Sequence, residues 1–336
     1  MKFPLPIREF TTSAELDEGI ETFLQRLGGP CWVRLRGRDR SRVRAMTTLL
    51  HGNEPSGVRA LHRFLRSGRE PATDILALVA NVSAALAPPG FAQRMLPGRR
   101  DLNRCFAGPT DDDEGRLAAE ILDSLRAARP EALIDLHNTS GAGPAYGVGV
   151  RADPPFLALV SLFSRHYVRT DIRLGALMEA TADEFPTVTI ECGGAREVQS
   201  DAVAFAGIEK YFCSPDVLGR HSDTSGVAVI ERPLRVRLAK GATLAYADAP
   251  VATCSLTLRT DIDHFNYSIL KPDVPIGWAA QHAPLDVSGR DDGQTGDTLF
   301  ELRDGRLYSR MPLRLFMATT NVRIAAADCL FYAVPL

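Results

Sequence analysis

The sequence has no long hydrophobic run and no strong imbalance of charge. No stretch of about 18 apolar residues occurs along the chain, so we expect no transmembrane helix. Residues 1–10 lack the apolar core of a secretory signal peptide, and we therefore expect a cytoplasmic protein. The formal net charge is only −2, which gives no general reason to expect nucleic acid or a membrane as a partner. The sequence leaves open whether the chain forms a homo-oligomer.

Cysteine is scarce and scattered. None of the six cysteines forms a Cys-x-x-Cys pair, so the spacing matches neither a structural zinc site nor a disulfide framework. We expect small core residues in a reducing compartment. Cys192 adjoins Glu191, a candidate catalytic residue. A cysteine hydrolase, however, needs a histidine to activate its thiol, and the two candidate histidines, His51 and His137, suit a metal better.

Helix-like and strand-like segments alternate up to about residue 222. Apolar residues recur at helical spacing over 114–128, further helices are expected over 156–167 and 197–212, and the run 75–80 is typical of a buried strand. The alternation predicts an α/β fold, a mixed sheet covered by helices on both faces. After the polar segment 220–226 only strand-like runs follow. We therefore predict a larger domain at 1–222 and a smaller β-rich domain at 223–336.

Six arginines alternate with other residues between positions 31 and 45. This pattern predicts a β-hairpin with one arginine-coated face around a turn at 37–41. A solvated hairpin at the edge of a sheet explains the pattern more simply than binding of a polyanion. The arginines are Arg34, Arg36, Arg38, Arg40, Arg42 and Arg44.

Three short polar segments each end a strand-like run. In open α/β sheets the carboxyl ends of the strands are where ligands bind, so we expect these segments to converge on one edge of the sheet. Their order along the chain is therefore compatible with a single site. They read His51-Gly-Asn-Glu54, Asp135-Leu-His137-Asn138-Thr139 and Thr189-Ile-Glu191-Cys192-Gly193-Gly194.

The side chains of these segments suit a metal-dependent hydrolase. A catalytic zinc ion takes three protein ligands and keeps a fourth position open, and His51, Glu54 and His137 supply such a set. A carboxylate must still take a proton from the attacking water and pass it to the leaving amine. Glu191 is the candidate for this general base. His-x-x-Glu alone is a weak signal, whereas the three segments together are much more specific.

Together with Asp101-Leu-Asn103-Arg104, the three segments resemble the aspartoacylase and succinylglutamate desuccinylase family, itself similar to zinc carboxypeptidases. The matching motifs run in the same order from about residue 51 to 194. The resemblance implies a zinc carboxypeptidase-like fold and a β-rich C-terminal domain that narrows access to the site. The site residues that it implies are one zinc ion per chain on His51, Glu54 and His137, Glu191 as general base, and Asn103 and Arg104 as ligands of the substrate carboxylate.

The resemblance also implies an arginine that stabilises the oxyanion of the tetrahedral intermediate. Arg94 is the nearest counterpart, but its spacing to Asp101 is longer than usual, so Arg99 and Arg100 remain alternatives. The predicted function is zinc-dependent removal of the acyl group from a small N-acyl amino acid or related amide. Carboxypeptidase action on short peptides is an alternative. A non-catalytic metal or small-ligand module is a weaker one, because binding alone does not require a general base.

The segment 178–184 departs from the family pattern. Members that process acidic substrates carry an arginine there, whereas this chain has Glu179, Asp183 and Glu184. Acids that face the pocket would favour neutral or cationic substrate side chains. The simpler interpretation is that all three lie on a solvated loop. Arg169 and Arg173 are the nearby arginines that would weaken an inference against dicarboxylates.

Overall fold

The computed structural model describes residues 4–10, 16, 19–219, 224, 226–289 and 295–336. The chain divides into two compact units. Unit 1 comprises Met1–Asn138, Ala145–Arg169 and Arg173–Val229, and unit 2 comprises Thr139–Pro144, Thr170–Ile172 and Ile230–Leu336. The predicted domain boundary between residues 222 and 223 lies outside the described residues.

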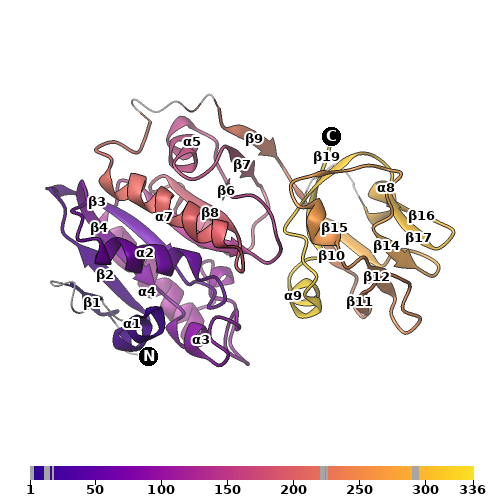
Figure 1. Cartoon of the computed structure of the whole chain (residues 1–336), viewed down its shortest axis with the longest axis horizontal. Helices are drawn as coiled ribbons and strands as arrows, with labels where there is room; N and C mark the ends of the chain where they lie inside the picture. Colours follow the sequence, from indigo (N-terminus) through magenta and orange to yellow (C-terminus); the bar gives the residue numbers. More distant parts are fainter. Residues whose placement is uncertain (1–3, 11–15, 17–18, 220–223, 225, 290–294) are drawn as a thin grey trace. The chain divides into compact units, whose positions relative to one another are not determined.

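Unit 1 is built on a nine-stranded mixed sheet, in the order β1-β2-β4-β3-β5-β8-β6-β7-β9 (Figure 1). Strands β3, β4 and β5 run parallel, whereas β2 is antiparallel to β4 and β6 is antiparallel to β8. The predicted mixed α/β sheet is thus confirmed. The strands are β1 (Ile7–Arg8), β2 (Cys31–Leu35), β3 (Asp39–Thr48), β4 (Thr73–Val79), β5 (Leu133–Thr139), β6 (Tyr146–Gly149), β7 (His166–Arg169), β8 (Thr187–Gly194) and β9 (Ala228–Glu231).

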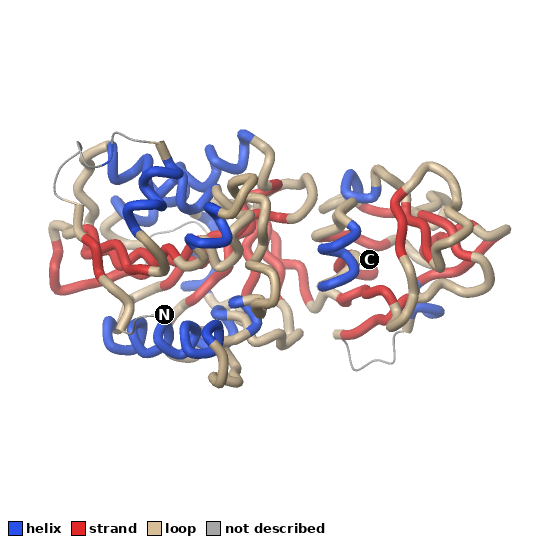
Figure 2. The backbone as a smooth tube through the Cα atoms, turned by 90° about the horizontal axis from the view of Figure 1, so that it is seen from below, coloured by secondary structure: helices blue, strands red, loops and turns tan. Residues whose placement is uncertain are grey.

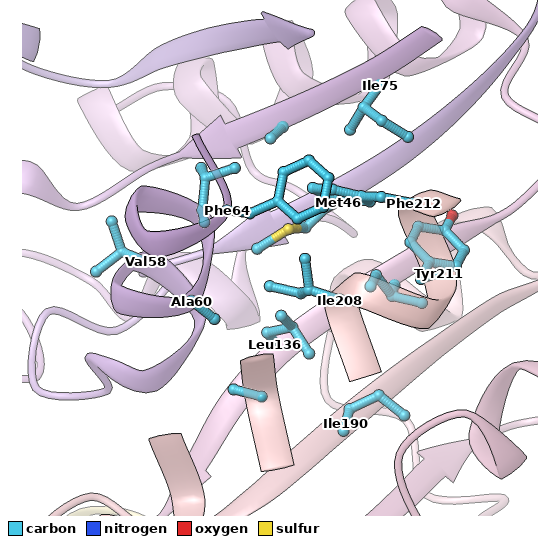
Figure 3. Packing of buried hydrophobic residues seen from close by; sticks show 14 of the residues in the cluster. Met46, Val58, Ala60, Phe64, Ile75, Leu136, Ile190, Ile208, Tyr211 and Phe212 are labelled. Atoms are coloured by element: carbon cyan, nitrogen blue, oxygen red, sulfur yellow. The ribbon is translucent and has the colours of Figure 1, made fainter. Parts of the chain in front are cut away.

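Helices cover both faces of this sheet (Figure 2). On one face, Ile75 and Ala77 of β4 belong to a buried cluster with residues of α1, α2, α5 and α7, part of which is seen in Figure 3. On the other face, Leu76 and Leu78 of the same strand pack with α4 and α6. This alternation is the period of two expected for a strand buried on both sides. The helices are α1 (Ile20–Leu27), α2 (Ser56–Arg66), α3 (Val82–Leu86), α4 (Asp113–Ala128), α5 (Pro154–Ser161), α6 (Leu177–Thr181) and α7 (Val198–Cys213), with a 3₁₀ turn at Leu102–Arg104.

The predicted arginine-coated hairpin is wrong. Strands β2 and β3 do not pair with each other, because β4 lies between them and pairs with both. Strand β3 is central, and Arg44 is fully buried rather than solvated. Its guanidinium donates to Glu131 Oε1 (2.5 Å) and to the carbonyl oxygens of Tyr211 (2.5 Å) and Ser214 (2.7 Å). The alternating arginines therefore do not mark an exposed edge.

The helix expected over 156–167 is also shorter than predicted. Helix α5 ends at Ser161, and the chain turns into β7 at His166, where Tyr167 is fully buried and extended. The apolar run 156–160 resumes after Ser161 with Leu162 and Phe163, so the apolar pattern alone did not place the helix end. The predicted helices at 114–128 and 197–212 correspond to α4 and α7.

Unit 2 contains two five-stranded, mostly antiparallel sheets and thus has the predicted β-rich character. Its own core joins residues from both sheets, including Val236, Leu258, Leu307 and Phe331. The first sheet has the order β13 (Ile269–Leu270), β18 (Leu313–Phe316), β19 (Phe331–Pro335), β10 (Leu234–Leu238), β15 (Leu285–Ser288). The second has the order β11 (Leu244–Tyr246), β12 (Leu256–Leu258), β14 (Gly277–Ala279), β17 (Arg306–Ser309), β16 (Phe300–Arg303), and the short helices are α8 (Gly296–Leu299) and α9 (Val322–Ala327), with a 3₁₀ turn at Ile262–Phe265. Among the described residues of the whole chain, every helix is too short or too polar to span a bilayer.

Candidate metal centre

Three strand ends bring the predicted site residues together. His51 and Glu54 lie in the turn between β3 and α2, His137 lies on β5, and Glu191 lies on β8. Leu136 and Ile190 point into the core cluster shared with α2 and α7. Because side chains alternate along a strand, His137 and Glu191 project from the opposite face of the sheet, the one covered by α4 and α6.

The two histidines and Glu54 form a compact set of candidate metal ligands. His51 Nδ1 lies 2.9 Å from Glu54 Oε1, and His137 Nδ1 lies 2.6 Å from Glu54 Oε2. One ligand atom from each of the three residues lies within 4.8 Å of the other two. All three side chains are buried. Two imidazole nitrogens and one carboxylate are the ligand set of an open, catalytic zinc site, so the residues present fit such an ion.

Each imidazole is held at its far nitrogen by another carboxylate. His51 Nε2 lies 2.9 Å from Asp101 Oδ1, and His137 Nε2 lies 2.8 Å from Asp135 Oδ2. Asp135 is fully buried and also accepts the hydroxyl of Thr47 at 2.6 Å, directly across from it on β3. Carboxylates at this position fix the tautomer of a metal-binding histidine, leaving the other nitrogen free to ligate. Both Nδ1 atoms face Glu54 and are thus the nitrogens available to a metal ion.

The charges of this cluster stabilise one another. Burial opposes ionisation of Glu54, but His51 and His137 outweigh it and hold the pKa of that carboxyl below its usual range. Burial likewise opposes the charged form of His137, yet Asp135 and Glu54 raise the pKa of the imidazole well above its ordinary value. Burial also opposes ionisation of Asp101, but His51 and Arg94 keep the pKa of this carboxyl below its usual range.

Glu191 differs from the other carboxylates of the site. It is 6 % exposed, and its Oε2 atom is buried without a hydrogen-bond partner among the described residues. Burial raises the pKa of Glu191 from 4.5 to about 7, with the charge of His137 acting in the opposite direction. A carboxyl group whose pKa lies near neutrality both accepts and returns a proton efficiently.

Of the three candidate arginines, Arg94 is the one that contacts the metal ligands. Its guanidinium donates twice to Asp101 Oδ2, at 3.0 and 2.9 Å, and lies 3.4 Å from Glu54 Oε1. Arg99 pairs with Asp113 at 2.5 Å, and Arg100 pairs with Asp112 at 2.5 Å. The contacts of Arg99 and Arg100 are therefore with acids at the start of α4.

Asn103 and Arg104 lie in the 3₁₀ turn that follows Asp101. The backbone N–H of Asn103 donates to Asp101 Oδ1 at 2.9 Å. The carboxylate that orients His51 is therefore hydrogen-bonded to this turn. Asn103 Oδ1 accepts the backbone N–H of Leu177 at 3.0 Å, and Arg104 donates to the carbonyl oxygen of Asn103 at 2.9 Å. The roles of Asn103 and Arg104 toward a substrate stay predictions.

The three acids of the segment 178–184 have other partners. Glu179 accepts the backbone N–H groups of Leu174 and Gly175 at 2.9–3.0 Å, which closes the turn before α6. Glu184 pairs with Arg126 at 2.9 Å on the surface, and the Asp183 side chain is 93 % exposed. Asp183 and Glu184 thus agree with the simpler interpretation of a solvated loop, whereas Glu179 lies on α6 and is half-buried.

The structure places three residues behind the candidate ligands for which the sequence predicts no role. Asp101 and Asp135 belong to the motifs, but the motifs do not predict them as partners of the histidines. For Asp135 a signal was present, because Asp-x-His on a strand places both side chains on one face. Thr47 had no comparable signal, since its contact depends on the register between β3 and β5.

The candidate site lies in a region of the chain that matches a known protein family. The model of the succinylglutamate desuccinylase/aspartoacylase catalytic domain matches residues 44–207. Comparison with curated proteins finds no match. Among solved structures, the fold is similar to a succinylglutamate desuccinylase/aspartoacylase from Rhodobacter sphaeroides at 18 % identity, covering 90 % of this chain and 86 % of that one with a TM-score of 0.55.

Two further structures share the fold. A succinylglutamate desuccinylase from Chromobacterium violaceum is 14 % identical, with 91 % of this chain and 88 % of that one covered and a TM-score of 0.56. The ectoine utilization protein EutE (DoeB) from Ruegeria pomeroyi, in a product-bound structure, is 16 % identical, with 87 % and 84 % covered and a TM-score of 0.55. The region matched by the family model contains the three candidate ligands and Glu191. Residues 44–207 therefore form a catalytic domain of the succinylglutamate desuccinylase/aspartoacylase family.

Proposed function

We propose that the protein is a zinc-dependent amidohydrolase that removes the acyl group from a small N-acyl amino acid or related amide. One observation carries the proposal. Beside a compact His-Glu-His ligand set, Glu191 has a buried carboxylate oxygen without a hydrogen-bond partner among the described residues. A site that only bound metal would gain nothing from such a group, because an unsatisfied buried carboxylate costs stability.

Different residues of the chain would bind the metal, transfer the proton and stabilise the developing charge. His51, Glu54 and His137 would hold the zinc ion, which supplies Lewis-acid polarisation of the substrate carbonyl and activation of water. Glu191 takes the proton from the attacking water and delivers it to the nitrogen of the leaving amine. Arg94, already beside Glu54, offsets negative charge that develops on the substrate oxygen.

Asn103 and Arg104 are proposed to bind the carboxylate of the N-acyl amino acid substrate. An arginine forms two parallel hydrogen bonds with a carboxylate, which a lysine cannot reproduce. The turn that contains both residues is hydrogen-bonded to Asp101, and Asp101 is in turn hydrogen-bonded to His51. The substrate carboxylate would thus be bound at a fixed position relative to the metal ligands.

We further propose a preference for substrates with neutral or basic side chains. The segment 178–184 lacks the arginine that a second substrate carboxylate would require. Glu179 and Glu184 bond to other partners, so repulsion by these acids is not the basis of this preference. Its basis is the absence of a cation that would pair with a second substrate carboxylate. Leaving a buried carboxylate without a partner costs about 1–3 kcal/mol, which predicts a preference of roughly tenfold to hundredfold.

Carboxypeptidase action on short peptides is the alternative within the same chemistry. It would use the same ligands and the same base, and would differ in what occupies the acyl side of the site. A panel of N-acetyl, N-succinyl and N-formyl amino acids, with dipeptides as comparison, separates the two. The proposal predicts turnover of at least one N-acyl amino acid that is lost in Glu191→Gln. Turnover confined to dipeptides would refute deacylation in favour of peptidase action.

A further inference from the structure

The three segments that carry the metal ligands and the base are joined by one buried hydrogen-bond network. Ser56 follows Glu54 by two residues, Asn138 directly follows His137, and Gly193 follows Glu191 by two residues. Ser56 is fully buried and Asn138 is 2 % exposed. Asn138, whose side chain hydrogen-bonds to both of the other segments, is therefore the chain neighbour of the candidate ligand His137.

Asn138 is the centre of this network. Its side-chain NH₂ donates to Ser56 Oγ at 2.9 Å and to the carbonyl oxygen of Gly193 at 3.0 Å. Its side-chain oxygen accepts the backbone N–H of Ser56 at 3.0 Å. One amide thus fixes the positions of the turn before α2 and of the end of β8 relative to β5.

Asp201 on α7 sets the direction of these hydrogen bonds. The hydroxyl of Ser56 donates to Asp201 Oδ1 at 2.6 Å, and an ionised carboxylate only accepts. Ser56 Oγ must then accept from Asn138, so the NH₂ group of Asn138 faces Ser56 Oγ and Gly193 while its oxygen faces the Ser56 amide. Asp201 is itself held by Arg59 of α2 at 3.2 Å and lies partly in solvent, outside the metal centre.

We propose that Asp201, Ser56 and Asn138 are positioning residues that set the placement of Glu191 relative to His51, Glu54 and His137. Their effect on turnover rests on the proposed function, whereas their effect on metal affinity does not. A misplacement of reacting groups by about 1 Å is enough to cost on the order of 10²-fold in rate. Residues that orient metal ligands from behind typically change metal affinity or activity by about 10–100-fold when replaced.

The test uses two variants that leave the metal ligands and Glu191 intact. Ser56→Ala removes only the hydroxyl, and Ser67→Ala is its control, since Ser67 caps the other end of α2 by donating to the Phe64 carbonyl at 2.6 Å. Asp201→Ala removes a partly exposed acid that is ion-paired to Arg59. Its control is Glu209→Ala, which removes another α7 acid, ion-paired to Arg69.

Zinc affinity, measured by competition with a chelator, and steady-state kinetics are compared for these four variants and for Asp201→Asn, all in the full chain. We expect Ser56→Ala and Asp201→Ala to lower zinc affinity by about tenfold or more, and to lower kcat without a matching change in KM. Asp201→Asn, which keeps an acceptor oxygen, should recover part of the loss. The controls should match the wild type in both measurements.

The outcomes distinguish this proposal from the proposed function. If the wild type binds zinc but cleaves none of the acyl substrates, the proposed function fails. The positioning role of Asp201, Ser56 and Asn138 is then tested by zinc affinity alone. If Ser56→Ala and Asp201→Ala equal their controls in zinc affinity and in kcat, the positioning role is overturned. A change confined to thermal stability, with zinc affinity and kcat unchanged, overturns it as well, because that is the signature of a packing role.

Discussion

Replacing Glu191 by glutamine should stabilise the metal-free protein at alkaline pH while it removes catalysis. The side chain is buried, one of its oxygens is without a partner among the described residues, and burial raises its pKa from 4.5 to about 7. The folded protein therefore disfavours the charged form that the reaction requires. Function and stability should respond in opposite directions at this one residue.

The magnitude follows from the size of that pKa rise. Each pKa unit corresponds to about 1.36 kcal/mol, so the rise to about 7 corresponds to about 3 kcal/mol of folding free energy. Below pH 4.5 the group is protonated in the folded and the unfolded chain, and the stability is present in full. As the pH rises from 4.5 to about 7, the unfolded chain ionises at this residue while the folded chain still holds the proton, and that stability is lost.

Denaturant unfolding of chelated wild type and Glu191→Gln at pH 5 and pH 8.5 measures this effect. The free energy of unfolding of the wild type should fall relative to the variant by most of about 3 kcal/mol between the two conditions. Any fixed cost of burying the amide cancels in this comparison. A stability difference that is the same at both pH values would refute the argument that Glu191 is a destabilised, buried carboxylate.

Three further substitutions follow from the contacts of the site and the core. Asp135→Asn should lower zinc affinity by about 10–100-fold, because the His137 imidazole loses its orienting carboxylate; unchanged zinc affinity in a chelator competition would contradict this. Arg104→Lys should mainly raise KM for an N-acyl amino acid; wild-type kinetics that are equal on the substrate and on its carboxamide would exclude the predicted role of Arg104. Arg44→Met should destabilise the protein by about 3–5 kcal/mol, since Glu131 Oε1 and the carbonyl oxygens of Tyr211 and Ser214 lose a buried donor, and a urea midpoint equal to that of the wild type would show that the ion pair contributes no net stability.

The sequence was sufficient for the parts of the site that are local in the chain. His51 and Glu54 are three residues apart at a strand end, and their joint orientation toward one ion follows from that spacing. Motif order then predicted that His137 and Glu191 arrive from other strands. The mixed sheet with helices on both faces followed from the alternation of helix-like and strand-like segments.

The remaining features depend on sheet order and register, which local patterns do not encode. Alternating arginines at 34–44 suggested a hairpin, yet β4 inserts between the two strands and buries Arg44. The partners of Asp135 and Asn138, likewise, are residues of β3, α2 and β8 that approach only in the folded sheet. Predicting them would require knowledge of which strands are neighbours.

The most direct test of metal-dependent deacylation is a titration of metal-free protein with zinc in the presence of an N-acyl amino acid. Bound zinc and hydrolysis are followed together, with His51→Ala and Glu191→Gln measured alongside. We predict that hydrolysis by the wild type saturates at about one zinc per chain, that His51→Ala loses the bound ion, and that Glu191→Gln binds zinc with turnover reduced by about 10² or more. Hydrolysis that is independent of added zinc, or undiminished in Glu191→Gln, would contradict the proposed chemistry.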